Sequence, residues 1–151
     1  MAEWLGWWTL TEARQRRDEL LDERQRIHIE LRKMPEEFKR EFEGRMGSLP
    51  AYIVMGAINT GGAQVRWRLR GRYKQSFVLM GGKAAAGMLS EAPAAVRGRL
   101  LDYERRGYWL NAAVAMRDRE IKLITHYLDI LERQRQLQRQ QNRRAKTSES
   151  E

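Results

Sequence analysis

Residues 65–74 decide the fold, and they read Val65-Arg66-Trp67-Arg68-Leu69-Arg70-Gly71-Arg72-Tyr73-Lys74. Up to the glycine, apolar and basic residues alternate. Successive side chains of a β-strand point to opposite faces of a sheet, so the alternation predicts a strand with one apolar and one basic face. We expect Val65, Trp67 and Leu69 to face a core. The basic residues of the other face, with those continuing the run past the glycine, are Arg66, Arg68, Arg70, Arg72 and Lys74.

The neighbouring segments also favour strands. Tyr52-Ile53-Val54-Met55 is a short run of β-prone residues, and residues 73–80 form another. The cluster Asn59-Thr60-Gly61-Gly62 is typical of a turn. Residues 51–80 are therefore predicted to form two or three antiparallel strands.

The residues before this region have helical periodicity. A first helix is expected from Thr9 or Thr11, each able to cap it, to Met34, with apolar residues at steps of three and four. Pro35 is expected to end this helix or to open a second, short helix that ends near Arg45.

The last helix is predicted from Pro93 to Glu132 by a seam with strict four–three spacing. That seam consists of Val96, Leu100, Tyr103, Gly107, Leu110, Val114, Arg117, Ile121, Ile124, Leu128 and Leu131. Such a 3.5-residue period is typical of a helix that packs along another helix. At the usual rise, this helix is about 60 Å long and the first one only roughly 38 Å. The uncovered remainder must therefore pack on the sheet, on a second copy of the chain or on another partner.

These patterns together predict an α+β fold that is mostly helical. Two long antiparallel, coiled-coil-like helices carry a small antiparallel β-hairpin or sheet inserted between them. Residues 1–132 form a single domain, with N-terminal helices in 1–46, the β insert in 51–80 and the long helix in 93–132. Residues 133–151 form a basic tail rich in Gln and Arg, frayed or disordered. A helical bundle with an irregular β excursion is the close alternative.

Composition limits the class of protein. The 151 residues include no cysteine, which excludes disulfides and thiolate metal sites. No apolar run reaches the ~18 residues that a membrane span needs, and the N-terminus does not have the pattern of a signal peptide. We expect a cytoplasmic protein that does not contact a membrane.

The net charge of +9 is concentrated in two places. Residues 44–90 hold seven basic residues and no acidic one, and residues 133–151 hold six basic residues against two acidic ones. Concentrated positive charge indicates a polyanionic partner, most commonly nucleic acid. The candidate phosphate contacts are the basic strand residues together with Arg143 and Arg144 of the tail, and DNA is the favoured ligand. The alternative is a solvated strand face whose arginines only keep an edge soluble, but such a face usually mixes charges of both signs.

The sequence does not contain a recognisable catalytic or metal-binding pattern. His28 and His126 each lie on a long helix without the companion ligands of a metal motif. No Ser/His/Asp or Cys/His arrangement can be assembled. We therefore expect no enzyme activity, no metal and no cofactor.

A second function fits the same residues. Trp4, Trp7 and Trp8 are dense for a chain end. They are expected either to cap the helices or to bind a partner. With the uncovered part of the long helix, they are compatible with a protein-interaction module, a homodimer, an inhibitor or a subunit of a nucleoprotein complex.

Residues 64–130 resemble small uncharacterised accessory proteins of proteobacterial integrating conjugative elements. In those proteins a short Arg-Trp-Arg strand precedes a long helix that carries Glu, Arg and Leu-Asn. The matching residues are Arg66-Trp67-Arg68, Pro93, Val96-Arg97, Leu100, Glu104, Arg105 and Leu110-Asn111. The resemblance implies a mobile genetic element and an accessory role near DNA.

Overall fold

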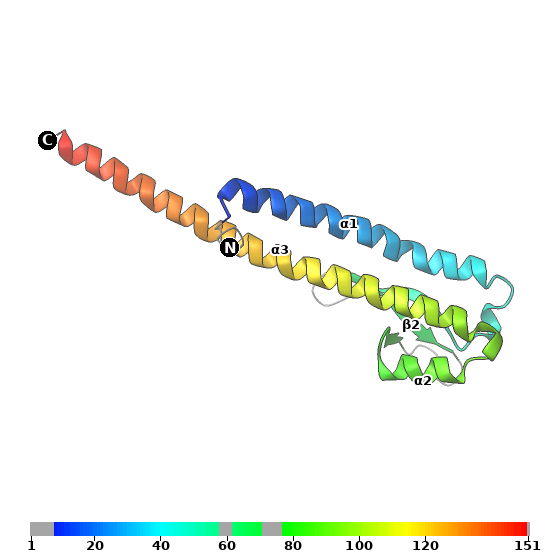
Figure 1. The fold of residues 1–151 in the computed structure, drawn as a ribbon. Coiled ribbons are helices and arrows are strands. Elements are labelled where there is room, and N and C mark those ends of the chain that lie inside the picture. Colours follow the sequence, from blue (N-terminus) through cyan, green and yellow to red (C-terminus); the bar gives the residue numbers. More distant parts are fainter. Residues whose placement is uncertain (1–7, 58–61, 71–76, 151) are drawn as a thin grey trace, which may run out of the picture. The chain divides into compact units, whose positions relative to one another are not determined.

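The computed structural model describes residues 8–57, 62–70 and 77–150, and its described part is a mostly helical α+β fold (Figure 1). In chain order the elements are α1 (Leu10–Glu41), the 3-10 helix η2 (Met46–Ser48), β1 (Ala51–Ala57), β2 (Ala63–Leu69), β3 (Phe77–Leu79), α2 (Lys83–Glu91) and α3 (Ala94–Glu149). The chain divides into two compact units. Unit 1 comprises Met1–Glu23 and Met116–Glu151, and unit 2 comprises Arg24–Ala115. Helices α1 and α3 each contribute residues to both units.

The three strands form one antiparallel sheet in the order β1-β2-β3, as the β-prone runs predicted. In the central strand, Val65 and Trp67 are fully buried and Leu69 is nearly so, while the arginines between them are half-buried. The predicted alternation of faces is therefore confirmed.

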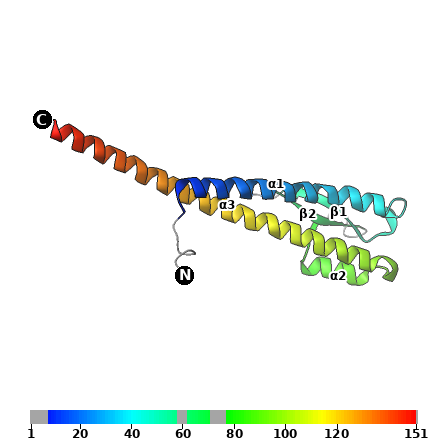
Figure 2. The same ribbon diagram turned by 45° about the horizontal axis from the view of Figure 1, so that its top comes forward.

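The apolar face of the sheet contributes to the main core, which lies in unit 2. Phe38 of α1 is at its centre. Its ring centroid lies 5.8 Å from that of Trp67 on β2 and 5.1 Å from that of Tyr103 on α3, both in near-perpendicular, edge-on arrangements. Such edge-to-face pairs stabilise a core beyond the area that they bury. Helix α2 adds Ala85, Met88 and Leu89 to the same core, and it lies beside the first turns of α3 (Figure 2).

Two polar side chains of α3 fix the central strand. The indole Nε1–H of Trp67 donates to the carboxylate of Glu104, which also accepts the backbone N–H of Gly81. Asn111 accepts from the backbone N–H of Val65 and donates to its carbonyl, both at 3.0 Å. Because Glu104 and Asn111 are two helical turns apart, they lie on one face of α3 and clamp β2 at two points.

The predicted seam of α3 is confirmed residue by residue, since each of its members is buried or half-buried. The structure also explains one of its two breaks. A Cβ at Gly107 would overlap the thioether of Met80 and lie 3.0 Å from a methyl group of Val65. Glycine at this point allows β2 and the end of β3 to approach the helix closely.

The prediction that Pro35 ends the first helix was wrong. Helix α1 runs without interruption from Leu10 to Glu41, with the proline inside it. Leu31, Met34, Phe38 and Phe42 follow one another at helical spacing, and each is at most 1 % exposed. Their burial outweighs the hydrogen bond lost at the proline, a cost of about 3 kcal/mol. The expected short second helix is therefore the end of α1. The two long helices are unequal in length, as predicted, with 32 residues in α1 and 56 in α3.

In unit 1 the start of α1 packs antiparallel to the middle of α3. Ala13 and Leu20 pack with Ile124 and Leu128 in a small apolar cluster. Ion pairs border this cluster in the same antiparallel order: Arg14 with Glu132, Arg16 with Glu120 and Glu23 with Arg117. The ion pair formed by Arg117 explains the charged break in the seam.

No helix in the described part of the chain combines the length and apolarity needed to cross a bilayer.

Candidate functional site

The basic side of the sheet carries the arginines that the sequence singled out. Directly opposed residues of neighbouring strands have their side chains on the same face. Arg68 lies between Tyr52 of β1 and Phe77 of β3, and Arg66 lies between Val54 and Leu79. Arg70 follows β2 and continues the pairing, since its backbone N–H donates to the carbonyl of Pro50 at 2.9 Å. We call this surface the arginine face, and its members are Tyr52, Val54, Arg66, Arg68, Arg70, Phe77 and Leu79.

Aromatic rings hold two of the guanidinium groups. The central carbon of the Arg68 guanidinium lies 5.3 Å from the ring centroid of Phe77 and 6.0 Å from that of Tyr52. The corresponding distance from Arg70 to Tyr52 is 4.6 Å. A guanidinium against a ring is attracted by the negative π face while its N–H groups stay available at its edge. These two arginines are therefore oriented without a carboxylate partner.

The third guanidinium lies across β1. Arg66 donates to the carbonyl of Ala57 at 3.4 Å. With its amide oxygen turned towards Arg66, Gln64 accepts two further bonds at 2.8 and 2.9 Å. A Cβ at Gly56 would lie 3.0 Å from the Arg66 side chain, so glycine provides the space in which this side chain rests.

Electrostatically, the arginine face is unneutralised. The three described strands contain no Asp or Glu, and within the described residues no ion pair joins Arg66, Arg68 or Arg70 to a carboxylate. The buried Nε of Arg70 has no hydrogen-bond partner in the structure. Arginines on the helices of unit 2, in contrast, have carboxylate partners. Arg99 donates a hydrogen bond to Glu41 at 2.7 Å, and Arg106 donates one to Glu37. The hydrogen bond from Arg106 lowers the pKa of the Glu37 carboxyl below its ordinary value.

The arginine face also exposes apolar side chains. The edge strand β3 exposes Phe77 and Leu79 by 51 % and 54 %. The arginine face therefore offers both cations and flat or aliphatic apolar groups to a ligand.

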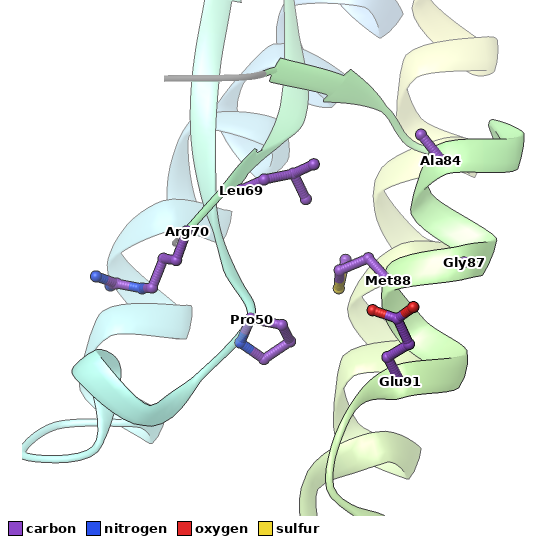
Figure 3. Close-up of a pocket in the computed structure, with 7 residues that line it drawn as sticks. All are labelled: Pro50, Leu69, Arg70, Ala84, Gly87, Met88 and Glu91. Carbon is purple, nitrogen blue, oxygen red and sulfur yellow. The ribbon is translucent and has the colours of Figure 1, made fainter. Parts of the chain in front are cut away.

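A hollow of about 440 Å³ lies beside the end of β2. Figure 3 shows that Leu69 points into it towards α2, whereas the guanidinium of Arg70 points away. Its wall is mostly apolar, and its charged members are Glu91 and Arg70, whose guanidinium is turned away, so the charged groups do not converge on a small ligand. The lining residues are Pro50, Leu69, Arg70, Ala84, Gly87, Met88 and Glu91. The candidate site is therefore the open face rather than this pocket.

The remaining predicted site residues lie elsewhere. Arg143 and Arg144 are exposed on α3 in unit 1, where the helix continues through the predicted tail as far as Glu149. Every described residue from 133 onward is exposed. Trp8 is 42 % exposed, and its carbonyl accepts from the hydroxyl of Tyr127 at 2.9 Å. Arg72, Lys74, Trp4 and Trp7 lie outside the described residues.

Sequence reasoning missed the apolar members of the arginine face. The sequence marks Tyr52, Val54, Phe77 and Leu79 only as β-prone residues. Because Tyr52 and Val54 alternate with Ile53, the sequence indicates that they share one face of a strand, but not that this face carries the arginines. The register that places these residues beside the arginines requires the paired sheet.

The described residues include no group of His, Cys, Asp and Glu side chains that could hold a metal ion.

Comparisons of the chain with protein-family models, with curated proteins and with solved structures gave no match. The resemblance to accessory proteins of conjugative elements therefore stays a prediction. Several residues that carry it, Trp67, Glu104 and Asn111 among them, join β2 to α3 and so have a structural role.

Proposed function

We propose that this protein binds nucleic acid without catalysing a reaction, and that the arginine face is its main contact surface. The observation that carries the proposal is the presence of three arginines on one open sheet face that contains no acidic residue. Guanidinium groups donate in a planar fork that matches phosphate oxygens. An accessory role in a mobile genetic element is part of the same proposal.

The physical basis of binding is electrostatic. Each arginine that neutralises a phosphate releases a condensed counterion, so affinity falls as salt rises. Arg68 and Arg70 are already oriented by the rings beneath them, which lowers the entropy lost when they engage a ligand. The exposed cations of α3, including Arg143 and Arg144, add phosphate contacts that do not depend on base sequence.

A charge-matched pair of variants tests this proposal. In the first, Arg66, Arg68 and Arg70 are changed to Gln, which keeps the aliphatic stems on the sheet. In the second, Arg32, Arg40 and Arg105, which are exposed on the helices of unit 2, are changed to Gln with the same loss of charge.

Binding to labelled single- and double-stranded DNA and RNA is measured by fluorescence anisotropy between about 50 and 200 mM salt. Three lost contacts should make the slope of log affinity against log salt shallower by about 2 for a single strand and by about 3 for a duplex. The ratio of wild-type affinity to variant affinity should therefore fall by about 20-fold for a single strand, and by about 40-fold for a duplex, between the lowest and the highest salt concentration. Equal effects of the two triple variants would show that net charge, and not the arginine face, governs binding. An absence of binding at the lowest salt would disprove the function.

A second candidate function rests on a different surface. On α3 in unit 1, Met116, Leu123, Ile130 and Leu137 recur every seven residues, and each is at least 38 % exposed. Seven residues bring a helix back to nearly the same face, so these side chains form a narrow apolar stripe outside the seam. The stripe supports coiled-coil-like pairing with another helix, either of a second copy or of a different protein.

Light scattering across a concentration series, on the wild type and on Leu123→Glu, tests self-association. A dimer that the substitution dissociates supports pairing of two copies through the stripe. A wild type that stays monomeric at every concentration excludes it.

A further inference from the structure

We infer that the arginine face takes single-stranded nucleic acid and that Phe77 stacks on one of its bases. This inference rests on the proposed function and specifies its ligand. The arginine face exposes more apolar area than phosphate binding requires, because a site that binds only phosphates does not need the exposed apolar side chains of β3. Phe77 and Leu79 are each more than half exposed on the same face as three unneutralised arginines.

The chemistry of the ligand follows from that mixture. A duplex presents phosphates, but it hides the flat faces of its bases in the stack, so it would leave Phe77 and Leu79 uncovered. A single strand presents phosphates and unstacked bases together, and sheets that bind it commonly use exposed rings as stacking platforms. An acidic protein surface would satisfy the arginines but supplies no flat aromatic partner.

The register sets how a strand would lie. Tyr52 and Phe77 are on the two outer strands, with Arg68 between them on β2. The Tyr52 ring is covered by the guanidinium groups of Arg68 and Arg70, whereas Phe77 at the edge of the sheet is half exposed. Phe77 is therefore the stacking platform. A base on its ring would bring the adjoining phosphate close to Arg68, which lies directly opposite Phe77 on β2.

The same face offers little for reading base identity. Gln64, a side chain of the kind that bonds base edges, is engaged by Arg66. The remaining contacts are guanidinium groups, rings and aliphatic groups, which every nucleotide can satisfy. We therefore expect weak sequence preference.

Phe77→Leu is the central variant, because it removes the ring while keeping an exposed apolar side chain on β3. Phe77→Tyr restores a ring of the same size. Trp109→Leu is the matched control, since Trp109 is 62 % exposed on α3 of the same unit but is not on the arginine face. Circular dichroism on each variant checks that the fold is retained. Each protein is titrated with a fluorescein-labelled single-stranded oligonucleotide of mixed sequence and with the duplex formed from it.

We expect the wild type to bind the single strand at least tenfold more tightly than the duplex at about 100 mM salt. Loss of one stacked base should weaken single-strand binding by about 5- to 150-fold in Phe77→Leu. The salt slope should not change, because no phosphate contact is lost. Phe77→Tyr and Trp109→Leu should bind like the wild type. A 2-aminopurine base in the strand should change its emission on binding wild type and not on binding Phe77→Leu.

The outcomes separate this inference from the proposed function. Equal binding of duplex and single strand, with no effect of Phe77→Leu, overturns the inference and leaves nucleic-acid binding standing. Single-strand preference without an effect of Phe77→Leu overturns the stacking assignment. Failure to bind any nucleic acid at about 50 mM salt, with binding of poly-glutamate instead, overturns both.

Discussion

Replacement of Gly107 by Ala should destabilise the protein, although alanine is the better helix former. Gly107 is buried in the seam of α3, where a Cβ would overlap the thioether of Met80 and lie 3.0 Å from a methyl group of Val65. Both neighbours are at most 4 % exposed, so neither can move into solvent. Overpacking of this kind costs about 1–3 kcal/mol, and helix propensity returns roughly 1 kcal/mol. Because the overlap with the Met80 sulfur is severe, the cost should lie in the upper half of that range, and the net loss should be about 1–2 kcal/mol.

Gly98→Ala is the matched control for this prediction. Gly98 lies in the same helix and the same unit, is exposed, and has no neighbouring atom within 4 Å of the position that a Cβ would occupy. Here only propensity acts, so the variant should gain about 0.5–1 kcal/mol. Urea unfolding followed by circular dichroism measures both free energies. If Gly107→Ala stabilised the protein as much as Gly98→Ala, the close approach of Met80 and Val65 to α3 would be refuted.

Three further predictions concern unit 2. Asn111→Ala should cost about 2 kcal/mol, because it leaves the N–H and C=O of Val65 without their partner, and Asn111→Asp should recover only the N–H bond. Equal free energies of unfolding for these two variants, measured in urea, would contradict this prediction. Trp67→Phe should cost about 2 kcal/mol or more, since it opens space in the core and removes the donor to Glu104; a thermal melt like that of the wild type would contradict this. Burial, with the nearby carboxylate of Glu41, raises the pKa of Tyr103 to about 12. The unfolded chain loses this proton near pH 10 while the folded chain keeps it, so stability should be retained below about pH 10 and fall as pH rises towards 12. Tyr103→Phe should remove that part of the alkaline loss, as denaturation at pH 9 and 11 would show.

The arginine face shows how far local pattern carries a prediction. The alternation in residues 65–70 was sufficient to place Trp67 in the core and Arg66, Arg68 and Arg70 outside it, because the side-chain period of a strand is fixed by its backbone. Nothing local indicated that Tyr52 and Phe77 would flank Arg68. Their positions depend on which residues pair across strands, and pairing is a property of the assembled sheet.

The helices divide in the same way. The four–three spacing of α3 identified its buried side, since the helical period is also fixed by the backbone. Pro35 misled the prediction because its local cost was judged without the burial of the residues around it, which the tertiary structure supplies.

The sequence by itself determined which segments form strands and long helices, which face of each is apolar, and where positive charge is concentrated. These properties follow from periodicity and composition, which act over a few residues. Only the tertiary structure decided that α1 continues through Pro35, that Gly107 admits Met80, that Glu104 and Asn111 clamp β2, and that aromatic rings border the arginines. Each of these features depends on contacts between residues that are far apart in the chain. A local sequence pattern does not report the energies of such contacts.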